Sequence, residues 1–310
     1  MNRLSIFLLG SLAMLLSVNT AGAQEGFAND PEKPLTLPGL NQYAPSSALG
    51  TNAVTGRTVR MEAALTEEGE PLKYGLTWRI FHPIAGPDGK LPLLATAEGG
   101  SAQFEFDPGE YYIHVAFGRA GVTKKLTVPR DGTPMEKQRI VLDAGGLVLN
   151  AVSGVDARIP AAQLRFNIYK AEEGMDGEQQ LVVEDVKPNT IVRLNSGTYH
   201  IVSEYGAVNA VIRSDIRVES GKLTEAIIQH RAAQLTLKLV SEPGGEAIAD
   251  TAWSILTSGG DVVSESVGAF PTIVLAEGEY TAIARNKGET HQREFTVLAG
   301  RNSDVEVPLN

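Results

Sequence analysis

Three phrases with the same arrangement of residues recur along this chain, and they constrain its fold more than any other feature. They are PGEYYIHVAFG at 108–118, SGTYHIVSEYG at 196–206 and EGEYTAIARNKG at 277–288. Each contains a glycine, one further residue, a tyrosine, a strand-like alternation and a closing glycine. Repetition at a nearly fixed period is typical of a chain built from similar structural units.

A second set of aromatic residues, upstream of the tyrosines, recurs at almost the same period. The tyrosines are spaced 88 and 81 residues apart, and the upstream aromatics are spaced 88 and 87. We therefore expect three units, 58–143, 144–231 and 232–310. The residues that mark them are the aromatics Trp78, Phe166 and Trp253, the tyrosines Tyr111, Tyr199 and Tyr280, and the glycines Gly109, Gly197 and Gly278.

Each unit contains seven short segments with the period-two alternation of β-strands, separated by clusters of Gly, Pro, Asn and Asp. The best helical candidate, 223–231, stands where the other units have a strand, so we expect a strand there. The pattern predicts an all-β fold of three tandem immunoglobulin-like β-sandwich domains of about 80 residues each. The alternation directs Trp78, Phe166 and Trp253 toward the core.

The repeated Gly-x-Tyr has a mechanical interpretation. Glycine permits a tight turn with positive φ before the strand. The tyrosine then buries its ring at a corner of the sheet, where its hydroxyl can bond the backbone, as in the tyrosine corner of immunoglobulin-like sandwiches. The alternative is a row of tyrosines that stack on a ligand, which explains equivalent core positions less well.

The N-terminus predicts export. A basic start is followed by an apolar run at 4–18 and by the small-x-small triplet Ala21-Gly22-Ala23, which is the plan of a signal peptide ending at residue 23. The run is short for a membrane anchor, and no later stretch is long enough to span a membrane. Residues 24–57 predict a flexible Pro/Gly/Ser-rich linker, with an added edge strand near 35–40 as the alternative.

Composition narrows the class of partner. The chain has no cysteine, which excludes disulfides, thiolate metal sites and a lipid-modified cysteine. Its formal net charge of −10 and the lack of a Lys/Arg stripe argue against nucleic acid and anionic lipid as partners.

The aromatic strand, the Gly-x-Tyr strand and the closing Val-x-Val resemble immunoglobulin-like or prealbumin-like modules of exported bacterial proteins, including carboxypeptidase-regulatory-like domains. The phrases at 223–240, 249–256 and 268–284 also resemble uncharacterised envelope proteins of alphaproteobacteria, some of which carry a von Willebrand factor A-type domain. This chain lacks the D-x-S-x-S phrase of that domain, so no such metal site carries over. The resemblance implies an envelope location and structural or adhesive work.

No catalytic, cofactor or metal motif is present. The chain has no G-x-S-x-G, H-E-x-x-H, G-x-x-x-x-G-K-[ST] or G-x-G-x-x-G. Its five histidines are dispersed, and we expect them to be solvent-exposed strand residues; they are His82, His114, His200, His230 and His291.

Two features leave a binding role open. Carboxylates precede the tyrosine in two units, Asp107 with Glu110 and Glu277 with Glu279, but unit two has Asn195 and Ser196 there, so turn chemistry is the simpler interpretation than calcium. Polar loops at 82–92 and 170–180 occupy the same turn in units one and two, where binding surfaces are often placed.

We therefore expect a non-enzymatic periplasmic protein, or a secreted or cell-surface one, that has a structural role or binds an envelope protein or glycan, with no cofactor. The alternatives are a small-ligand or calcium-binding module, and an enzyme or inhibitor with a site at a domain interface.

Overall fold

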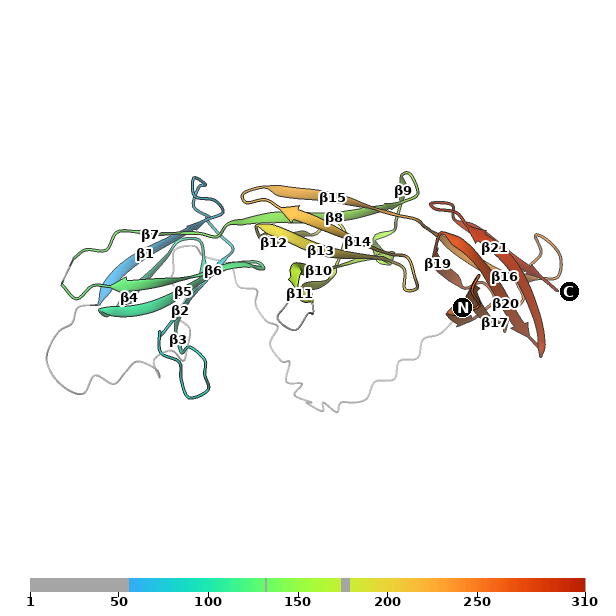
Figure 1. Cartoon of the computed structure of the whole chain (residues 1–310), viewed down its shortest axis with the longest axis horizontal. Coiled ribbons are helices and arrows are strands. Elements are labelled where there is room, and N and C mark those ends of the chain that lie inside the picture. Colours follow the sequence, from blue (N-terminus) through green and yellow to red (C-terminus); the bar gives the residue numbers. More distant parts are fainter. Residues whose placement is uncertain (1–55, 132, 174–178, 310) are drawn as a thin grey trace, which may run out of the picture. The chain divides into compact units, whose positions relative to one another are not determined.

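The computed structural model describes residues 56–131, 133–173 and 179–309. The expected signal peptide and residues 24–55 of the expected linker lie outside them. The described residues consist mainly of strands (Figure 1). Their only helical element is the short 3-10 turn η2 (Ala161–Gln163). The predicted all-β fold of tandem β-sandwiches is confirmed.

Three sets of seven strands follow one another, with one short additional strand in the second set. The first repeat contains β1 (Arg57–Ala64), β2 (Leu76–Phe81), β3 (Leu93–Gly99), β4 (Ala102–Phe106), β5 (Gly109–Phe117), β6 (Ala120–Val128) and β7 (Gln138–Val141). The second contains β8 (Ala144–Ser153), β9 (Ala157–Arg158), β10 (Leu164–Glu173), β11 (Gln179–Val186), β12 (Ile191–Asn195), β13 (Gly197–Tyr205), β14 (Val211–Val218) and β15 (Leu223–His230). The third contains β16 (Ala232–Val240), β17 (Ala252–Thr257), β18 (Val262–Val267), β19 (Thr272–Ala276), β20 (Gly278–Asn286), β21 (Glu289–Val297) and β22 (Ser303–Pro308).

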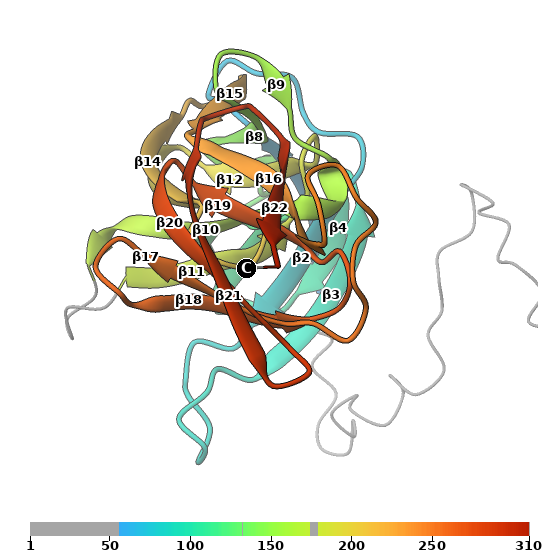
Figure 2. The ribbon, with the colours of Figure 1, turned by 90° about the vertical axis from the view of Figure 1, so that its right-hand side faces the viewer.

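Each repeat has two sheets with the same connectivity. The smaller sheets have the orders β4-β1-β7, β12-β8-β15 and β19-β16-β22, and β9 adds to the second of them. The larger sheets have the orders β3-β2-β5-β6, β11-β10-β13-β14 and β18-β17-β20-β21. In every repeat the first and last strands pair in parallel and the other strands pair antiparallel. In Figure 2 the third repeat lies nearest the viewer, with strands of both of its sheets labelled.

The repeated aromatics lie at the centre of each sandwich. Trp78, Phe166 and Trp253 are at most 1% exposed, and each belongs to the core cluster of its own repeat. Strand β2 alternates buried and half-buried positions along LTWRIF, as a strand with one face on a core must.

The two tryptophans also satisfy their polar atom in the same way. Trp78 Nε1–H donates to the Gly100 carbonyl at 2.8 Å, and Trp253 Nε1–H donates to the Gly268 carbonyl at 2.9 Å. Buried indoles need such a partner, because an unpaired N–H in an apolar core is costly. Both acceptors lie in the connection between the third and fourth strands of the repeat, so the indole also fixes that connection.

Trp253→Ala removes the largest buried side chain of the third repeat. We expect a loss of about 3–5 kcal/mol in the free energy of unfolding, since a cavity forms and the Gly268 carbonyl loses its donor. Hydrogen exchange followed by mass spectrometry should show increased exchange across 232–309 and little change in the other repeats. The control is Val267→Ala on the adjacent strand, where the side chain is 78% exposed and removing it should change stability by less than about 0.5 kcal/mol. Equal effects of the two substitutions would contradict the prediction.

Candidate functional site

The three tyrosines make the same hydrogen bond. The hydroxyl of Tyr111 donates to the carbonyl of Asp107 at 3.0 Å, that of Tyr199 to Asn195 at 2.9 Å, and that of Tyr280 to Ala276 at 3.0 Å. In each case the acceptor lies four residues upstream, before the strand that carries the tyrosine. The bond closes the turn between the fourth and fifth strands of each repeat. Burial raises the pKa of Tyr199.

Only one of the three glycines before these tyrosines has the backbone conformation expected from the sequence. Gly197 has a φ of +150°, whereas Gly109 and Gly278 do not have positive φ. A Cβ on Gly109 or Gly278 would instead lie 3.8 or 3.5 Å from the ring of Tyr111 or Tyr280. The expectation of a positive-φ turn is therefore wrong for Gly109 and Gly278, where the glycine lies beside the tyrosine ring.

The turn before Tyr199 makes the contact between the first and second repeats. The side-chain oxygen of Asn195 accepts from the backbone N–H of Gly121 at 3.1 Å, and its Nδ2 donates to the Leu142 carbonyl at 2.8 Å. Ser196 donates from its N–H to the carbonyl of Asp143 at 2.7 Å and from its hydroxyl to the Asp143 carboxylate at 2.6 Å. These bonds hold the turn against the segment that leads from β7 to β8.

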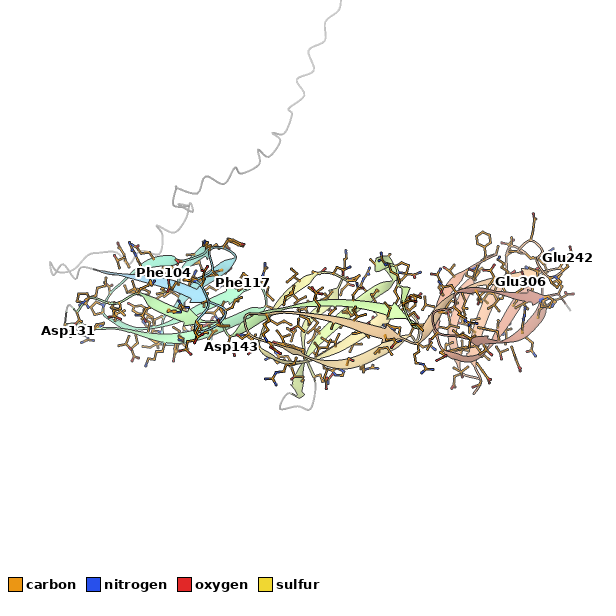
Figure 3. All side chains as sticks on the ribbon, turned by 90° about the horizontal axis from the view of Figure 1, so that it is seen from above. Phe104, Phe117, Asp131, Asp143, Glu242 and Glu306 are labelled. Atoms are coloured by element: carbon orange, nitrogen blue, oxygen red, sulfur yellow. The ribbon has the colours of Figure 1, made fainter. Side chains whose placement is uncertain are left out.

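Two further contacts support this first junction. The hydrogen bond from the Ser196 hydroxyl, together with Ser220, lowers the pKa of Asp143, which Figure 3 labels. The guanidinium of Arg193 lies 4.4 Å from the centre of the Phe117 ring, a cation–π distance. Residues of the second repeat thus contact both the last hairpin and the exit segment of the first.

The turn before Tyr280 makes the equivalent contact between the second and third repeats, with the asparagine on the opposite side. The Oδ1 of Asn209, in the β13–β14 loop, accepts from the N–H of Ala276 at 2.9 Å. Its Nδ2 donates to the Tyr280 hydroxyl at 2.9 Å. Ala276 occupies the position equivalent to Asn195, since both lie four residues before their tyrosine. Each junction therefore has one asparagine amide bonded to the backbone of the neighbouring repeat.

A glycine seven residues after the tyrosine allows the repeats to approach. A Cβ on Gly118 would lie 3.0 Å from the Cβ of Arg193, and one on Gly206 would lie 2.7 Å from the Cβ of Val274. Both glycines have positive φ, +66° and +73°. In the third repeat, Lys287 stands at this position. The sequence marked these closing glycines as turns, but only the structure shows that they are sites of contact between repeats.

Two of the four carboxylates considered for calcium, Glu110 and Glu277, are paired with basic side chains. Glu110 lies 2.7 Å from the Lys125 ammonium, and Glu277 forms an ion pair with Arg231. The described residues contain no group of three or more His, Cys, Asp or Glu side chains able to hold a metal ion. Calcium needs six to eight oxygen ligands.

The expectation that all five histidines are solvent-exposed is wrong for two of them. His230 is 0% exposed and His291 is 4% exposed. His114 and His200 face outward as expected, and their Nδ1 atoms lie 2.9 Å from the Thr123 hydroxyl and 2.8 Å from the Asp215 carboxylate. The sequence signal was available for His230, because it continues the inward alternation of β15.

His230 lies in the core of the second repeat as a neutral imidazole. Its Nε2 lies 2.8 Å from the hydroxyl of Ser203, which is also fully buried, and the Tyr205 ring packs edge-on at 5.9 Å. Burial lowers the pKa of His230 to about 4. No general acid or base for catalysis is implied, because the imidazole has no access to solvent.

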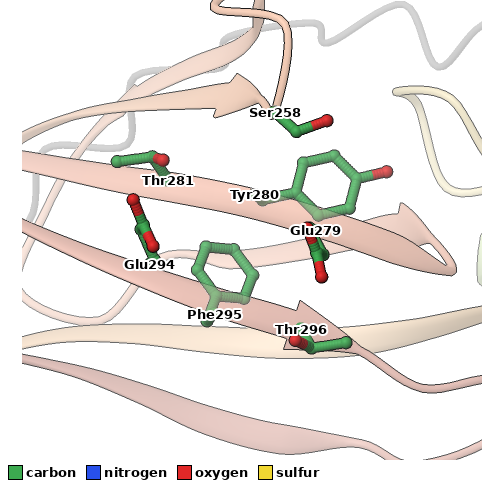
Figure 4. Close-up of a pocket in the computed structure, with 7 residues that line it drawn as sticks. All are labelled: Ser258, Glu279, Tyr280, Thr281, Glu294, Phe295 and Thr296. Atoms are coloured by element: carbon green, nitrogen blue, oxygen red, sulfur yellow. The ribbon is translucent and has the colours of Figure 1, made fainter.

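One hollow of about 290 Å³ lies beside the Tyr280 corner (Figure 4). Its lining includes the rings of Tyr280 and Phe295, whose centres lie 5.9 Å apart, and the carboxylates Glu279 and Glu294. Tyr280 is only 6% exposed and Tyr199 is 8% exposed, so these two tyrosines offer little ring surface for a ligand to stack on. The loop at 82–92 connects β2 to β3, while part of the loop at 170–180 lies outside the described residues.

Tyr280→Phe should destabilise the protein more than Tyr111→Phe does. Both substitutions remove a hydroxyl-to-carbonyl bond, but only the first also leaves Asn209 Nδ2 without its acceptor at a part-buried junction. We expect a loss of about 0.5–1.5 kcal/mol for Tyr111→Phe and about 1–3 kcal/mol for Tyr280→Phe, measured by urea unfolding. The reverse order would show that the Asn209 contact adds nothing.

Gly206→Ala and Gly288→Ala form a matched pair that tests the second junction. Both glycines have positive φ, +73° and +86°, but a Cβ on Gly288 has no atom within 4 Å. Both variants therefore carry the backbone strain of about 1 kcal/mol, and only Gly206→Ala also forces the repeats apart. We expect Gly206→Ala to lose about 1–3 kcal/mol more in thermal or urea unfolding. Equal losses in the free energy of unfolding would mean that the junction accommodates the added methyl group without destabilising the protein.

Stability should fall on acidification because of His230. Its pKa is near 6.5 in the unfolded chain and about 4 in the folded one, so the unfolded state binds more protons between these values. The contribution is fully present above pH 6.5 and is lost as the pH falls toward 4, by about 2–3 kcal/mol. His230→Gln cannot titrate, so its free energy of unfolding should change less between pH 7 and pH 4.5 than that of the wild type. Identical changes would assign the pH dependence to carboxylates alone.

By sequence, one repeat of this chain matches a known protein family. By structure, the array of three repeats is only distantly similar to solved proteins. The family described as the Rhizobiales growth-associated tandem repeat domain matches residues 234–309, within the third repeat. No curated protein matches the chain.

Several solved structures, two of them pilins, are distantly similar. The Bacillus anthracis TIE protein is 16% identical, with 82% of this chain and 50% of that chain covered, at a TM-score of 0.26. The minor pilin GBS52 of Streptococcus agalactiae is 12% identical, covering 56% and 95%, at 0.29, and the major pilin BcpA of Bacillus cereus is 11% identical, covering 82% and 99%, at 0.20. The chain thus spans about half the length of the first of these proteins, and likeness at this level concerns the kind of fold at most.

Proposed function

We propose that this chain is an exported, non-enzymatic envelope protein whose three β-sandwich domains, 58–143, 144–231 and 232–310, have a structural or partner-binding role. The observation that carries the proposal is the repeated junction. In the second and third repeats, the turn before the tyrosine strand forms hydrogen bonds to the preceding repeat. These turns are the places where a catalytic or metal-binding protein could carry its reactive side chains. A chain whose turns connect neighbouring repeats is suited to present a continuous protein surface.

The side-chain chemistry of the described residues supports this proposal over an enzyme. His230 is neutral and bonded to the buried Ser203, and the turn carboxylates Glu110 and Glu277 are paired with basic side chains. The lining of the hollow beside Tyr280 includes the two carboxylates Glu279 and Glu294 and no basic side chain. No helix among the described residues is long and apolar enough to cross a bilayer.

We infer a periplasmic location from the predicted signal peptide of residues 1–23, with secretion or surface display as the alternative. The modules are proposed to be immunoglobulin-like or prealbumin-like, and the partner to be an envelope protein or a glycan. A calcium-binding or small-ligand module is the second candidate, favoured by the hollow between Glu279 and Glu294.

Fractionation and N-terminal mass spectrometry of the C-terminally tagged full chain, expressed in its native host, test the location. The expected result is a chain that begins at Gln24 in the periplasmic or extracellular fraction. A chain that begins at Met1 in the cytoplasm would overturn the proposal.

Affinity capture from a detergent extract of the cell envelope tests the binding role. We expect one enriched partner that is lost when the loop at 82–92 is shortened to a tight turn. The matched control is a variant with the short turn at 257–261 replaced by another of equal length, which should keep the partner. A melting temperature raised by millimolar calcium, with no partner captured, would instead support the ligand-binding candidate.

A further inference from the structure

Strand β15 differs from the two strands that occupy the same place in the other repeats. Strands β7, β15 and β22 each end the smaller sheet of their repeat and pair with its first strand. Exposed edge strands tend to pair with other chains, and proteins commonly protect them by shortness, charge or proline. Strand β7 has only four residues and includes Arg139, which bonds Glu62, and β22 carries Asp304 and ends at Pro308.

Strand β15 is neither short nor ended by proline, and its one charged side chain is that of Glu225. It has eight residues, LTEAIIQH, without lysine, arginine or proline. Its outward positions include Leu223, 50% exposed, and Ile227, 71% exposed. On the same face, Ile191 of β12 is 54% exposed, and Gly146 of β8 lies between it and Leu223. We call Ile191, Leu223 and Ile227 the β15 patch.

The backbone of β15 is ready to accept another strand. The carbonyls of Lys222 and His230 accept from the N–H groups of Gly146 and Gly154, so the even-numbered residues point their backbone groups toward β8. Because these groups alternate along a strand, the N–H and C=O groups of Leu223, Glu225, Ile227 and Gln229 point to the free edge. Among the described residues, β8 is the only strand that pairs with β15.

We propose that β15 pairs antiparallel with β15 of a second copy of this chain, about a two-fold axis at Ile227. This register places Ile227 opposite Ile227, Glu225 opposite Gln229, and Leu223 opposite Arg231. All these residues have odd numbers, so the pairs are of the hydrogen-bonded kind. The same face of both copies then points to one side, and the two β15 patches become continuous.

Charge favours a second copy in this register. Glu225 lies diagonal to Arg231 of the other copy, within reach of long side chains, and the two-fold axis makes this contact twice. Arg231 is 76% exposed at its side chain, and its pairing with Glu277 leaves guanidinium donors for a second carboxylate. A register centred on Glu225 would place the two carboxylates directly opposite each other, which is unfavourable.

The chain has no cysteine, so single introduced cysteines report the register directly. In the proposed dimer the two Cα atoms of residue 227 are about 5.5 Å apart, within reach of a disulfide. Those of residue 225 are separated along the strands by about 13 Å, which is too far. Under mild oxidation, Ile227→Cys should form covalent dimers at least tenfold faster than Glu225→Cys. An equimolar mixture of Glu225→Cys and Gln229→Cys should also cross-link.

Analytical ultracentrifugation of the uncrosslinked, purified chain provides the second measurement. The wild type should dimerise as its concentration is raised, and Ile227→Lys should weaken dimerisation at least tenfold with an unchanged melting temperature. The control is Val267→Lys, which replaces an apolar side chain on β18 that is 78% exposed. This variant should dimerise like the wild type. A wild-type chain that stays monomeric at every concentration, a dimer unaffected by Ile227→Lys, or equal cross-linking at 225 and 227 would overturn the proposal.

Discussion

The hydrogen bond from each tyrosine hydroxyl to the carbonyl four residues upstream fixes the part of the structure on which both junctions depend. It sets the conformation of the turn before the fifth strand of the repeat, and in the second and third repeats that turn contacts the preceding repeat. Asn195 and Ala276 each accept a tyrosine hydroxyl with their carbonyl and also bond the neighbouring repeat. Folding of a repeat and its attachment to the previous one are therefore coupled through one residue.

The two junctions meet the same requirement with different residues. A backbone N–H at the edge of one repeat needs an acceptor when the next repeat covers it, because a buried unpaired donor is costly. An asparagine amide supplies the acceptor in both cases, from the following repeat at the first junction and from the preceding repeat at the second. The close approach also requires a residue without Cβ, which Gly118 and Gly206 provide.

The second repeat differs from the first and third in two features, a fully buried histidine and an edge strand with an exposed apolar patch. It contains the neutral buried His230, and its edge strand β15 presents the β15 patch with Glu225 as its one charged side chain, whereas β22 carries Asp304 and ends at Pro308. These two features lie on opposite faces of one strand, since even-numbered residues of β15 face the core and odd-numbered residues face solvent. Equivalent core positions thus preserve the fold, while the outer positions of a single strand are free to acquire a function.

The sequence by itself determined the class of fold and the positions of the main core residues. Period-two alternation and the recurrence of Trp78, Phe166 and Trp253 were sufficient, because the burial of alternate residues is a local property of a strand. Only the tertiary structure decided what the turns and closing glycines do. Asn209 bonds Ala276 and Tyr280 across 67 and 71 residues, and no local pattern distinguishes such an asparagine from a turn residue exposed to solvent. The free edge of β15 is likewise a property of strand order, which depends on which strands pair and not on the residues of one strand.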